Sequence, residues 1–272
     1  MDKIFMKSRR KIAIVGGTGG MGQVLVKELK PYADIIIISR SIEKAKQFSN
    51  KFGVQGGTLK DCNNADIIFV SVPINSTYET CQKLFQIVKP GSLIIDISAV
   101  KTHLKKLETE LPDHISYISM HPLFGPDGSF KDYNVILVPI KENNWLSELQ
   151  ELLDNLGAIT SITTIEKHDF FMSKIQVAHH FMYLILASYL SDTPIPPSFF
   201  TRSFKKTLAN FQGIEKNLNA ILEIQQANPY GKKTRTEIKS LVEKFISLNE
   251  AEINELMQQI KAFKKDYIIK NE

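Results

Sequence analysis

Cysteine is scarce in this chain: Cys62 and Cys81 are the only two among 272 residues. Two isolated thiols exclude a disulfide-stapled scaffold and favour a reduced, cytoplasmic setting. Histidine, cysteine and carboxylate residues are nowhere grouped at the spacing of metal sites, so we expect no bound metal. The longest apolar stretch, residues 175–190, includes two histidines. It is shorter than the roughly 20 residues of a transmembrane helix. We expect no membrane span and interpret the stretch as a buried helix at a subunit interface.

Neither sign of charge dominates the chain. Lys and Arg number 34 and Asp and Glu 29, which leaves a net charge of +5. The excess is spread along the chain, and no basic run is long enough to favour nucleic acid as a partner. With 43% hydrophobic and 23% charged residues, the composition is that of a folded protein. The length allows two domains of ordinary size. We therefore expect a small-molecule substrate and a mild attraction for anions.

Short apolar runs rich in Ile and Val alternate with amphipathic stretches through the first half of the chain. The runs are residues 12–15, 35–38, 67–70, 93–97, 115–118 and 135–138, and helical patterns between them include 21–29, 41–52 and 76–87. Continuous apolar runs are typical of strands buried on both faces. The alternation predicts an α/β fold with a doubly wound, mostly parallel sheet.

The character of the chain changes at about Glu166, where strand-like runs give way to helical patterns. Proline-containing breaks at residues 194–197 and 228–231 divide the helical region, so we expect three or four long helices. We predict a dinucleotide-binding domain over residues 1–164 and an all-helical substrate and dimerisation domain over residues 165–272. The glycine-rich turn described next comes early and the helical patterns run late, so we expect a monofunctional protein.

A glycine-rich turn, Gly-Gly-Thr-Gly-Gly-Met-Gly, follows the first apolar run directly at residues 16–22. Gly17, Gly19 and Gly22 fit the dinucleotide fingerprint of a Rossmann-type sheet. The first glycine allows a tight turn, the second lets the pyrophosphate approach, and the third lets helix and strand pack closely. The helix that follows would offer free N–H groups to the phosphates. We predict that the cofactor-binding residues of this turn are Gly17, Thr18, Gly19, Gly20, Met21 and Gly22.

The second apolar run ends in Ser39, Arg40 and Ser41. A domain that prefers NAD commonly places an acidic residue here, where it binds the ribose 2′-hydroxyl. Two hydroxyls and a planar cation suit a 2′-phosphate instead. The sequence therefore predicts NADP as the cofactor, bound in part by Ser39, Arg40 and Ser41.

Three further segments follow strand-like runs and should lie at the carboxyl edge of the sheet, where ligands bind. Val72 and Pro73 follow the third run, and Lys101 closes the segment after the fourth. We predict that these three residues contact the cofactor. His121 follows the fifth run in a loop framed by Pro and Gly. A histidine held there can exchange a proton near neutral pH.

At this point the sequence resembles the prephenate dehydrogenase family, the TyrA-type cyclohexadienyl dehydrogenases. The resemblance is carried by the glycine turn, by residues 70–75 (Val-Ser-Val-Pro-Ile-Asn) and 96–101, and by residues 121–126 (His-Pro-Leu-Phe-Gly-Pro). It continues in the helical region with Glu166, His168, Asp169, Gln176 and His180. From the residues alone, we interpret His168 and Asp169 as a pair that caps or orients a helix start.

The resemblance implies an oxidative decarboxylation of prephenate to 4-hydroxyphenylpyruvate in tyrosine biosynthesis, for which the residues after the second apolar run predict NADP as the cofactor. It implies that His121 is the catalytic histidine, which draws a proton from the substrate hydroxyl. Gln176 and His180 would share one helix face and line the substrate pocket. The resemblance also implies a homodimer formed through the helical domain.

Two positions depart from the family pattern. The family commonly has a serine at the position of Ala99, and Ser98 stands one residue upstream. Gln212 falls where the family has an arginine for the substrate carboxylate, and glutamine cannot form a bidentate ion pair. We retain Ser98 and Gln212 as substrate-binding candidates. The departures leave two alternatives: a dehydrogenase of arogenate or 4-amino-4-deoxyprephenate, or a catalytically silent NADP-binding homologue.

Overall fold

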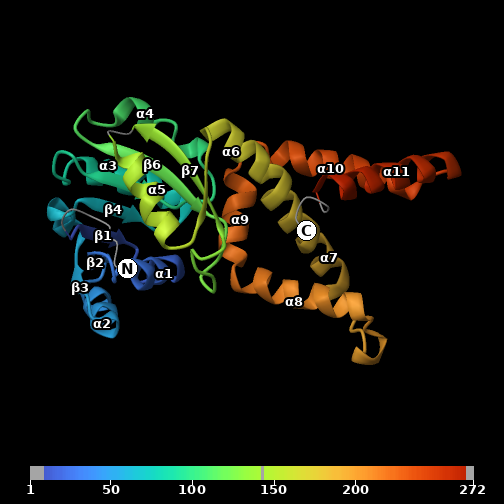
Figure 1. Ribbon diagram of the computed structural model, residues 1–272. Coiled ribbons are helices and arrows are strands. Elements are labelled where there is room, and N and C mark those ends of the chain that lie inside the picture. Colours follow the sequence, from blue (N-terminus) through green and yellow to red (C-terminus); the bar gives the residue numbers. More distant parts are fainter. Residues whose placement is uncertain (1–8, 142–143, 268–272) are drawn as a thin grey trace.

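A computed structural model describes residues 9–141 and 144–267, and its first part is built on one eight-stranded sheet (Figure 1). The strand order is β3-β2-β1-β4-β5-β6-β7-β8. Neighbouring strands run parallel except β6 and β7, which are antiparallel. The strands are β1 (Lys11–Val15), β2 (Asp34–Ile38), β3 (Gln55–Gly57), β4 (Ile67–Val70), β5 (Leu93–Asp96), β6 (Ser116–Pro122), β7 (Asn134–Lys141) and β8 (Ile159–Ile162).

Helices cover both faces of the sheet and create two apolar cores. Alternate residues of each central strand enter different cores: Ile12 and Ile14 belong to one, Ala13 and Val15 to the other. The first core is closed by α1 (Gly20–Leu29) and α5 (Trp145–Asn155), and the second by α3 (Ile74–Phe85) and α4 (Leu107–Glu110). This two-sided burial explains why the central strands are continuous apolar runs. Helix α2 (Ile42–Phe52) and the short turns η1 (Leu59–Asn64) and η2 (Thr102–Leu104) complete this part.

The predicted doubly wound sheet is confirmed, and two strands were missed. Strand β3 is Gln-Gly-Gly and offers no apolar run to detect. Strand β8 lies at the other edge and leaves Ile159 and Ile162 about half exposed, so it resembles neither a buried nor an alternating strand. His121 was expected in a loop, but it lies within β6, opposite Ile136 of β7.

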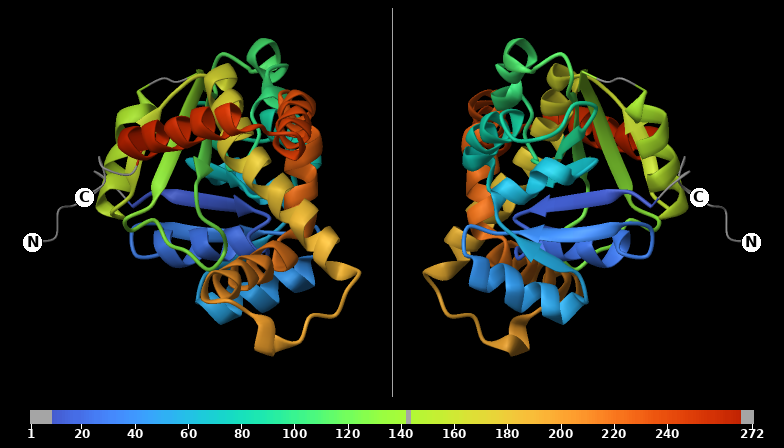
Figure 2. Two further views of the ribbon diagram at one scale, coloured as in Figure 1. Left: turned by 90° about the vertical axis from the view of Figure 1, so that its right-hand side faces the viewer. Right: turned by 90° about the vertical axis from the view of Figure 1, so that its left-hand side faces the viewer.

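The second part of the chain is helical and gathers on one side of the sheet, with α10 and α11 running outward from it (Figures 1 and 2). It contains α6 (Ile165–Met172), a π-helical turn η3 (Ser173–Val177), α7 (Ala178–Ser191), η4 (Pro197–Phe199), α8 (Arg202–Lys216), α9 (Leu218–Ala227), α10 (Gly231–Ile246) and α11 (Glu250–Tyr267). Four of these helices, α7, α8, α10 and α11, have 14 to 18 residues and agree with the expected three or four long helices, and the shorter α6 and α9 were not expected. Breaks at Asn217 and Ser247, which contain neither Pro nor Gly, divide this part further.

Helix α7 contains most of the long apolar stretch, yet none of its residues is buried within the chain. Across residues 9–141 and 144–267, no helix has both the length and the apolar character needed to cross a membrane. The second part of the chain therefore presents an apolar helix that its own fold covers only in part.

Candidate active site

The carboxyl ends of β1, β2, β4, β5 and β6 meet at one edge of the sheet, and the glycine-rich turn lies there. Gly16 has a φ of +79°, and a Cβ added to it would stand 2.1 Å from the Ser71 carbonyl oxygen. A Cβ on Gly22 would stand 2.3 Å from the Gly16 carbonyl oxygen. The left-handed residue is therefore Gly16, and not Gly17, to which the sequence analysis assigned the tight turn. Glycine is needed at both ends of this turn.

Helix α1 begins in this turn with its first N–H groups free of side-chain caps. Gly19 is the N-cap residue, no side chain caps it, and the first turn contains no acidic residue. Gly19 and Gly20 are exposed, whereas Thr18 and Met21 are half-buried. An uncapped helix start reached by exposed glycines fits a pyrophosphate group. The first part of the chain thus has the cradle that a dinucleotide requires.

The loop after His121 lies against this cradle. A Cβ on Gly20 would stand 2.7 Å from Cγ of Pro126, so the end of the His-Pro-Leu-Phe-Gly-Pro segment touches the start of α1. The structure thus brings the glycine turn and the segment of His121 together, although about 100 residues separate them in the chain.

Ser39, Arg40 and Ser41 lie at the end of β2, as the sequence places them. Arg40 is exposed, and it makes no hydrogen bond or ion pair with the described part of the chain. The Ser41 hydroxyl is already engaged: it caps α2 by accepting from Lys44 N at 3.2 Å and donates to Glu43 Oε2 at 2.7 Å. Ser39 Oγ accepts from Ser41 N at 3.4 Å, so the Arg40 guanidinium and the O–H of Ser39 are the groups left for a ligand. Glu43 is an acid near this position that the sequence analysis did not consider.

Val72 and Pro73 lead into α3 at the same edge, where the helical part touches the sheet. Pro73 is exposed and is the N-cap residue of α3. Glu223 of α9 accepts a hydrogen bond from the backbone N of Ile74 at 3.1 Å. A carboxylate from the second part of the chain therefore caps a helix of the first part.

His121 is held by a chain of buried polar groups. Its Nδ1 lies 2.9 Å from Nε2 of His168, and Nδ1 of His168 lies 2.7 Å from Oδ1 of Asp169. The three residues are exposed by only 4%, 2% and 0%. Burial, the Lys101 ammonium and the neighbouring His168 hold the pKa of His121 well below its ordinary value. His121 is therefore neutral at pH 7 and able to accept a proton.

His168 and Asp169 do not cap a helix start, contrary to the sequence analysis. Thr164 is the N-cap residue of α6, and its side chain accepts from Lys167 N. Burial lowers the pKa of His168, although the hydrogen bond with Asp169 opposes this. Burial alone would raise the pKa of Asp169, but hydrogen bonds from His168, Thr102 and the backbone of Lys101 outweigh it, so the pKa is lowered. The pair instead connects α6 with His121 and with the segment after β5.

Two residues expected to contact ligands point into the protein. The Lys101 side chain is fully buried: its Nζ donates to the carbonyl oxygens of Ser98 and Met120 at 2.7 and 2.8 Å and lies 3.6 Å from Asp96 Oδ1. The Ser98 hydroxyl is also buried, hydrogen-bonded to Asp96 and donating to the Val100 carbonyl oxygen. Both side chains hold the segment after β5 in shape and are not free to bind cofactor or substrate. Ala99 packs against a small apolar cluster that includes Val100 and Val177.

Gln176 and His180 each have a buried polar atom without a partner in the described chain, Oε1 of Gln176 and Nδ1 of His180. They belong to consecutive turns, Gln176 to the π-helical turn η3 and His180 to α7. Burial and the neighbouring His179 lower the pKa of His180 to about 4, so its ring is neutral at pH 7. A buried polar atom without a hydrogen-bond partner lowers the stability of the folded protein unless a ligand or a water molecule satisfies it. Gln212, by contrast, is exposed on α8.

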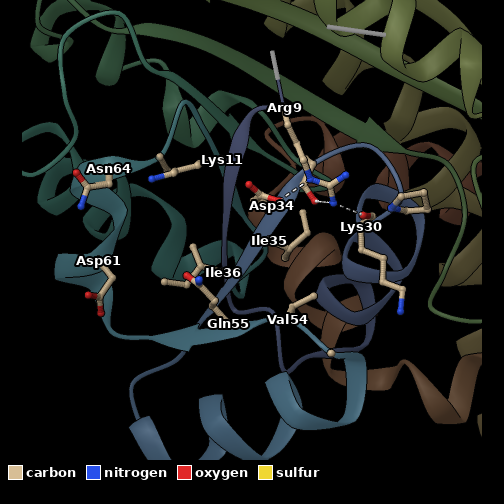
Figure 3. Close-up of a pocket in the computed structure, with 14 residues that line it drawn as sticks. Arg9, Lys11, Lys30, Asp34, Ile35, Ile36, Val54, Gln55, Asp61 and Asn64 are labelled. Carbon is tan, nitrogen blue, oxygen red and sulfur yellow. Dashed lines mark hydrogen bonds and ion pairs between the residues drawn. The ribbon is translucent and has the colours of Figure 1, made fainter. Parts of the chain in front are cut away.

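A cavity of about 740 Å³ lies at the opposite edge of the sheet, near the amino ends of β1 and β2 (Figure 3). Its charged lining is mixed, with Arg9, Lys11 and Lys30 beside Asp34 and Asp61. Arg9 and Asp34 form an ion pair at 2.5 Å. His121 and the glycine turn lie at the other end of these strands, the carboxyl edge, where parallel sheets bind their ligands. The cavity is therefore remote from the candidate active site. Within the described residues, no group of three His, Cys, Asp or Glu side chains could hold a metal ion.

Comparison with known proteins identifies relatives of this chain. The family model for the nucleotide-binding domain of prephenate dehydrogenase matches residues 25–162. A probable arogenate/prephenate dehydrogenase from Methanocaldococcus jannaschii is 31% identical over 189 residues, which are 66% of this chain and 42% of the relative. The T-protein of Haemophilus influenzae is 30% identical over 189 residues, 68% of this chain and 46% of the relative. The chain thus spans less than half the length of these two relatives.

The fold has the same counterpart among solved structures. Prephenate dehydrogenase from Aquifex aeolicus, solved in complex with hydroxyphenyl propionate and NAD+, superposes with a TM-score of 0.69 at 19% identity. The match covers 95% of this chain and 98% of that one, so it includes the helical part as well as the sheet. Since the family model covers about half of the residues, the chain belongs to the prephenate dehydrogenase family.

Proposed function

We propose that this protein is a cytoplasmic, NADP-dependent prephenate dehydrogenase, with residues 1–164 binding the cofactor and residues 165–272 contributing the substrate site. One observation carries the proposal: the loop after His121 touches the start of α1 at Gly20. A proton acceptor and a dinucleotide cradle thus share one edge of the sheet. The bound cofactor supplies a hydride acceptor, and the glycine turn with Ser39 and Arg40 would hold it.

In the proposed reaction, a hydride leaves the ring carbon that bears the hydroxyl. The bond to the ring carboxylate breaks, CO₂ departs, and the released electron pair completes the aromatic ring. As the substrate oxygen gains carbonyl character, the His121 ring draws off the hydroxyl proton, and it returns that proton to the phenol. Aromatisation supplies most of the driving force, so the protein mainly orients and polarises the substrate.

A panel of three substrates tests the reaction. Prephenate, arogenate and 4-amino-4-deoxyprephenate are each mixed with the protein and NADP, and NADPH formation is followed by absorbance. We expect prephenate to be oxidised with the highest kcat/KM. The second candidate, arogenate, is favoured by the unpartnered Oε1 of Gln176, because a buried acceptor suits the ammonium group of that side chain. NADP binding without an absorbance change on any of the three would instead indicate a silent homologue.

The preference for NADP is attributed to Arg40. Replacing Arg40 by Ala removes a charge-assisted contact with the 2′-phosphate. We expect kcat/KM for NADP to fall about 10–100-fold while the value for NAD stays within about twofold. Lys46→Ala, which removes an exposed charge farther along α2, is the matched control and should change neither value. An unchanged ratio of NADP to NAD efficiency in Arg40→Ala would contradict the assignment.

A homodimer through the helical part is proposed from the uncovered face of α7. Met182, Ile185 and Tyr189 are exposed by 45%, 43% and 78%, and large apolar patches of this kind mark interfaces. We expect the protein to sediment as a dimer and Ile185→Glu to sediment as a monomer. Ile159→Glu makes the same change at an isoleucine of similar exposure on β8 and should remain dimeric. A monomeric native protein would contradict this proposal.

A further inference from the structure

Three buried side chains from different elements form a continuous hydrogen-bonded series ending at His121. His121 lies on β6, and His168 and Asp169 lie on α6. Nδ1 of His121 has His168 Nε2 as its partner at 2.9 Å, and the rings lie 5.1 Å apart between centroids. No other hydrogen bond to the His121 ring occurs within the described residues. Nε2 of His121 makes no hydrogen bond with the described residues, and it is not fully enclosed by them. The second ring nitrogen is therefore the one left for a ligand.

The far end of the series determines where its protons reside. Asp169 accepts hydrogen bonds from Lys101 N at 2.9 Å, from Thr102 N at 2.8 Å and from Thr102 Oγ1 at 2.6 Å. A carboxylate surrounded by three donors is ionised and can only accept. The fourth contact, with Nδ1 of His168, therefore requires a proton on that nitrogen. Since a neutral imidazole has one N–H, Nε2 of His168 must be an acceptor.

The protonation of His168 in turn determines that of His121. An acceptor at His168 Nε2 requires a donor at His121 Nδ1, so the proton of neutral His121 resides on Nδ1. Its Nε2 then has a free lone pair. We propose that His168 and Asp169 are positioning residues that set this tautomer of His121, so that Nε2 is the atom that takes the substrate proton. This inference rests on the proposed function for the role of His121, but the tautomer itself is a property of the protein without substrate.

The proton transfer also changes the charge at the centre of this cluster. When the substrate O–H bond breaks and an N–H bond forms at Nε2, His121 becomes a cation. Asp96, Lys101 and Asp169 are ionised around the series, and Lys101 forms an ion pair with Asp96 at 3.6 Å. Burial and the Lys101 ammonium oppose the imidazolium, which is why the pKa of His121 is lowered. The Nδ1 proton of His121 stays hydrogen-bonded to His168 throughout, which keeps the ring from turning.

Two neutral substitutions separate the two halves of His168. In His168→Asn, the side-chain amide can occupy the position of Nδ1 and still donate to Asp169, but it cannot reach His121. In His168→Gln, the amide reaches the position of Nε2, where its oxygen can accept from His121. The Asn variant therefore keeps the bond to Asp169 and loses the bond to His121, whereas the Gln variant keeps the bond to His121 and loses the bond to Asp169. Thermal unfolding of both variants shows whether each is folded.

The tautomer is read from two-bond ¹⁵N–¹H correlation spectra of the ligand-free protein, with His121→Asn identifying the His121 signals. We expect the native protein and His168→Gln to have the His121 proton on Nδ1, and His168→Asn to have a mixture of tautomers. With substrate, His168→Asn should lower kcat about 10²-fold, the lower end of what a general base contributes, with KM unchanged. His168→Gln should stay within about tenfold of native kcat.

A native His121 with its proton on Nε2 would overturn the inference, even if neither variant folds. So would a folded His168→Asn whose tautomer and kcat match the native protein. The two proposals fail in different ways. If the tautomers behave as expected but the native protein oxidises none of the three substrates, the proposed function fails and the positioning role stands. If prephenate is oxidised while the His121 proton lies on Nε2, the reverse holds.

Discussion

Replacing His121 by Asn is expected to lower kcat about 10²–10⁴-fold, because it removes the proposed general base at the carboxyl edge of the sheet. Affinity for NADP should stay within about twofold, since the glycine turn and Arg40 are untouched. The Asn amide can occupy the position of Nδ1 and still donate to His168 Nε2, so we expect a loss of folding stability below the roughly 1–3 kcal/mol of an unsatisfied buried group. Stopped-flow turnover, fluorescence titration with NADPH and thermal unfolding measure the three effects. Retained turnover would contradict the role of His121.

The pH dependence of the native enzyme follows from the same site. Since burial and Lys101 hold the pKa of His121 well below its ordinary value of 6.5, the base stays unprotonated as the pH falls through 6.5. We expect kcat/KM to remain flat there and to decline only in more acidic solution. Stability behaves differently. Below pH 6.5, the unfolded chain binds protons that folded His121 and His168 do not, so the free energy of unfolding decreases as the pH falls toward their lowered pKa values.

A control separates these two effects. In His121→Asn, one of the two depressed histidines is absent, so thermal stability should fall less steeply between pH 6.5 and pH 5 than in the native protein. Equal slopes for the two proteins would show that His121 is not buried as a neutral ring. A kcat/KM that halves near pH 6.5 would show that its pKa is not depressed.

The sheet and the cofactor half were predictable because their signals are local. An apolar run, a glycine turn and a helix start follow one another within residues 12–29, and each has a fixed geometric consequence. The two edge strands were not predictable by the same rule. Gln55 to Gly57 of β3 contains no apolar residue, and β8 is paired on one side only, so neither has the burial that marks an internal strand.

The partners of His121 were missed because they lie 47 residues away, and only the fold brings them together. A signal for their burial was nevertheless present. Ile165, His168, Asp169 and Met172 stand at the spacing i, i+3, i+4 and i+7, and these four are the buried residues of α6. A histidine and an aspartate on the apolar face of a helix need polar partners inside the protein. That spacing predicts a buried network, but it cannot name the partner.

Ser98 and Lys101 were expected to contact ligands, but the fold buries both side chains. Position at the end of β5 suggested contact with ligands, because loops at the carboxyl edge commonly bind them. The polar groups of the loop itself also need hydrogen-bond partners, however, and the fully buried Asp96 lies beside Ser98 and Lys101. Lys101 and Ser98 hydrogen-bond to this carboxylate or to nearby carbonyl oxygens. Their side chains therefore shape the loop on which any ligand would rest.

Replacing Gly22 by Ala is expected to have a large effect on both folding and cofactor binding. The added Cβ would lie 2.3 Å from the Gly16 carbonyl oxygen and 2.6 Å from Gly17 Cα. Both atoms are backbone, so helix α1 and the turn must move apart. We expect the thermal midpoint to fall by about 5–10 °C, as for an overpacked core position, and NADPH affinity to fall at least about 100-fold, because the shifted helix no longer points its N–H groups at the pyrophosphate.

Gly19→Ala and Gly213→Ala separate the two effects. At Gly19 the nearest atom to an added Cβ is 3.3 Å away, so the fold should persist within about 2 °C in midpoint. The methyl group would nevertheless occupy the approach to the pyrophosphate and weaken NADPH binding. At Gly213 of α8, nothing lies within 4 Å of the new atom, so alanine should leave NADPH affinity unchanged and slightly favour the helix. The order of affinities, native and Gly213→Ala above Gly19→Ala above Gly22→Ala, distinguishes a cofactor cradle from a turn that serves the fold alone. In the latter case Gly19→Ala would bind NADPH as the native protein does.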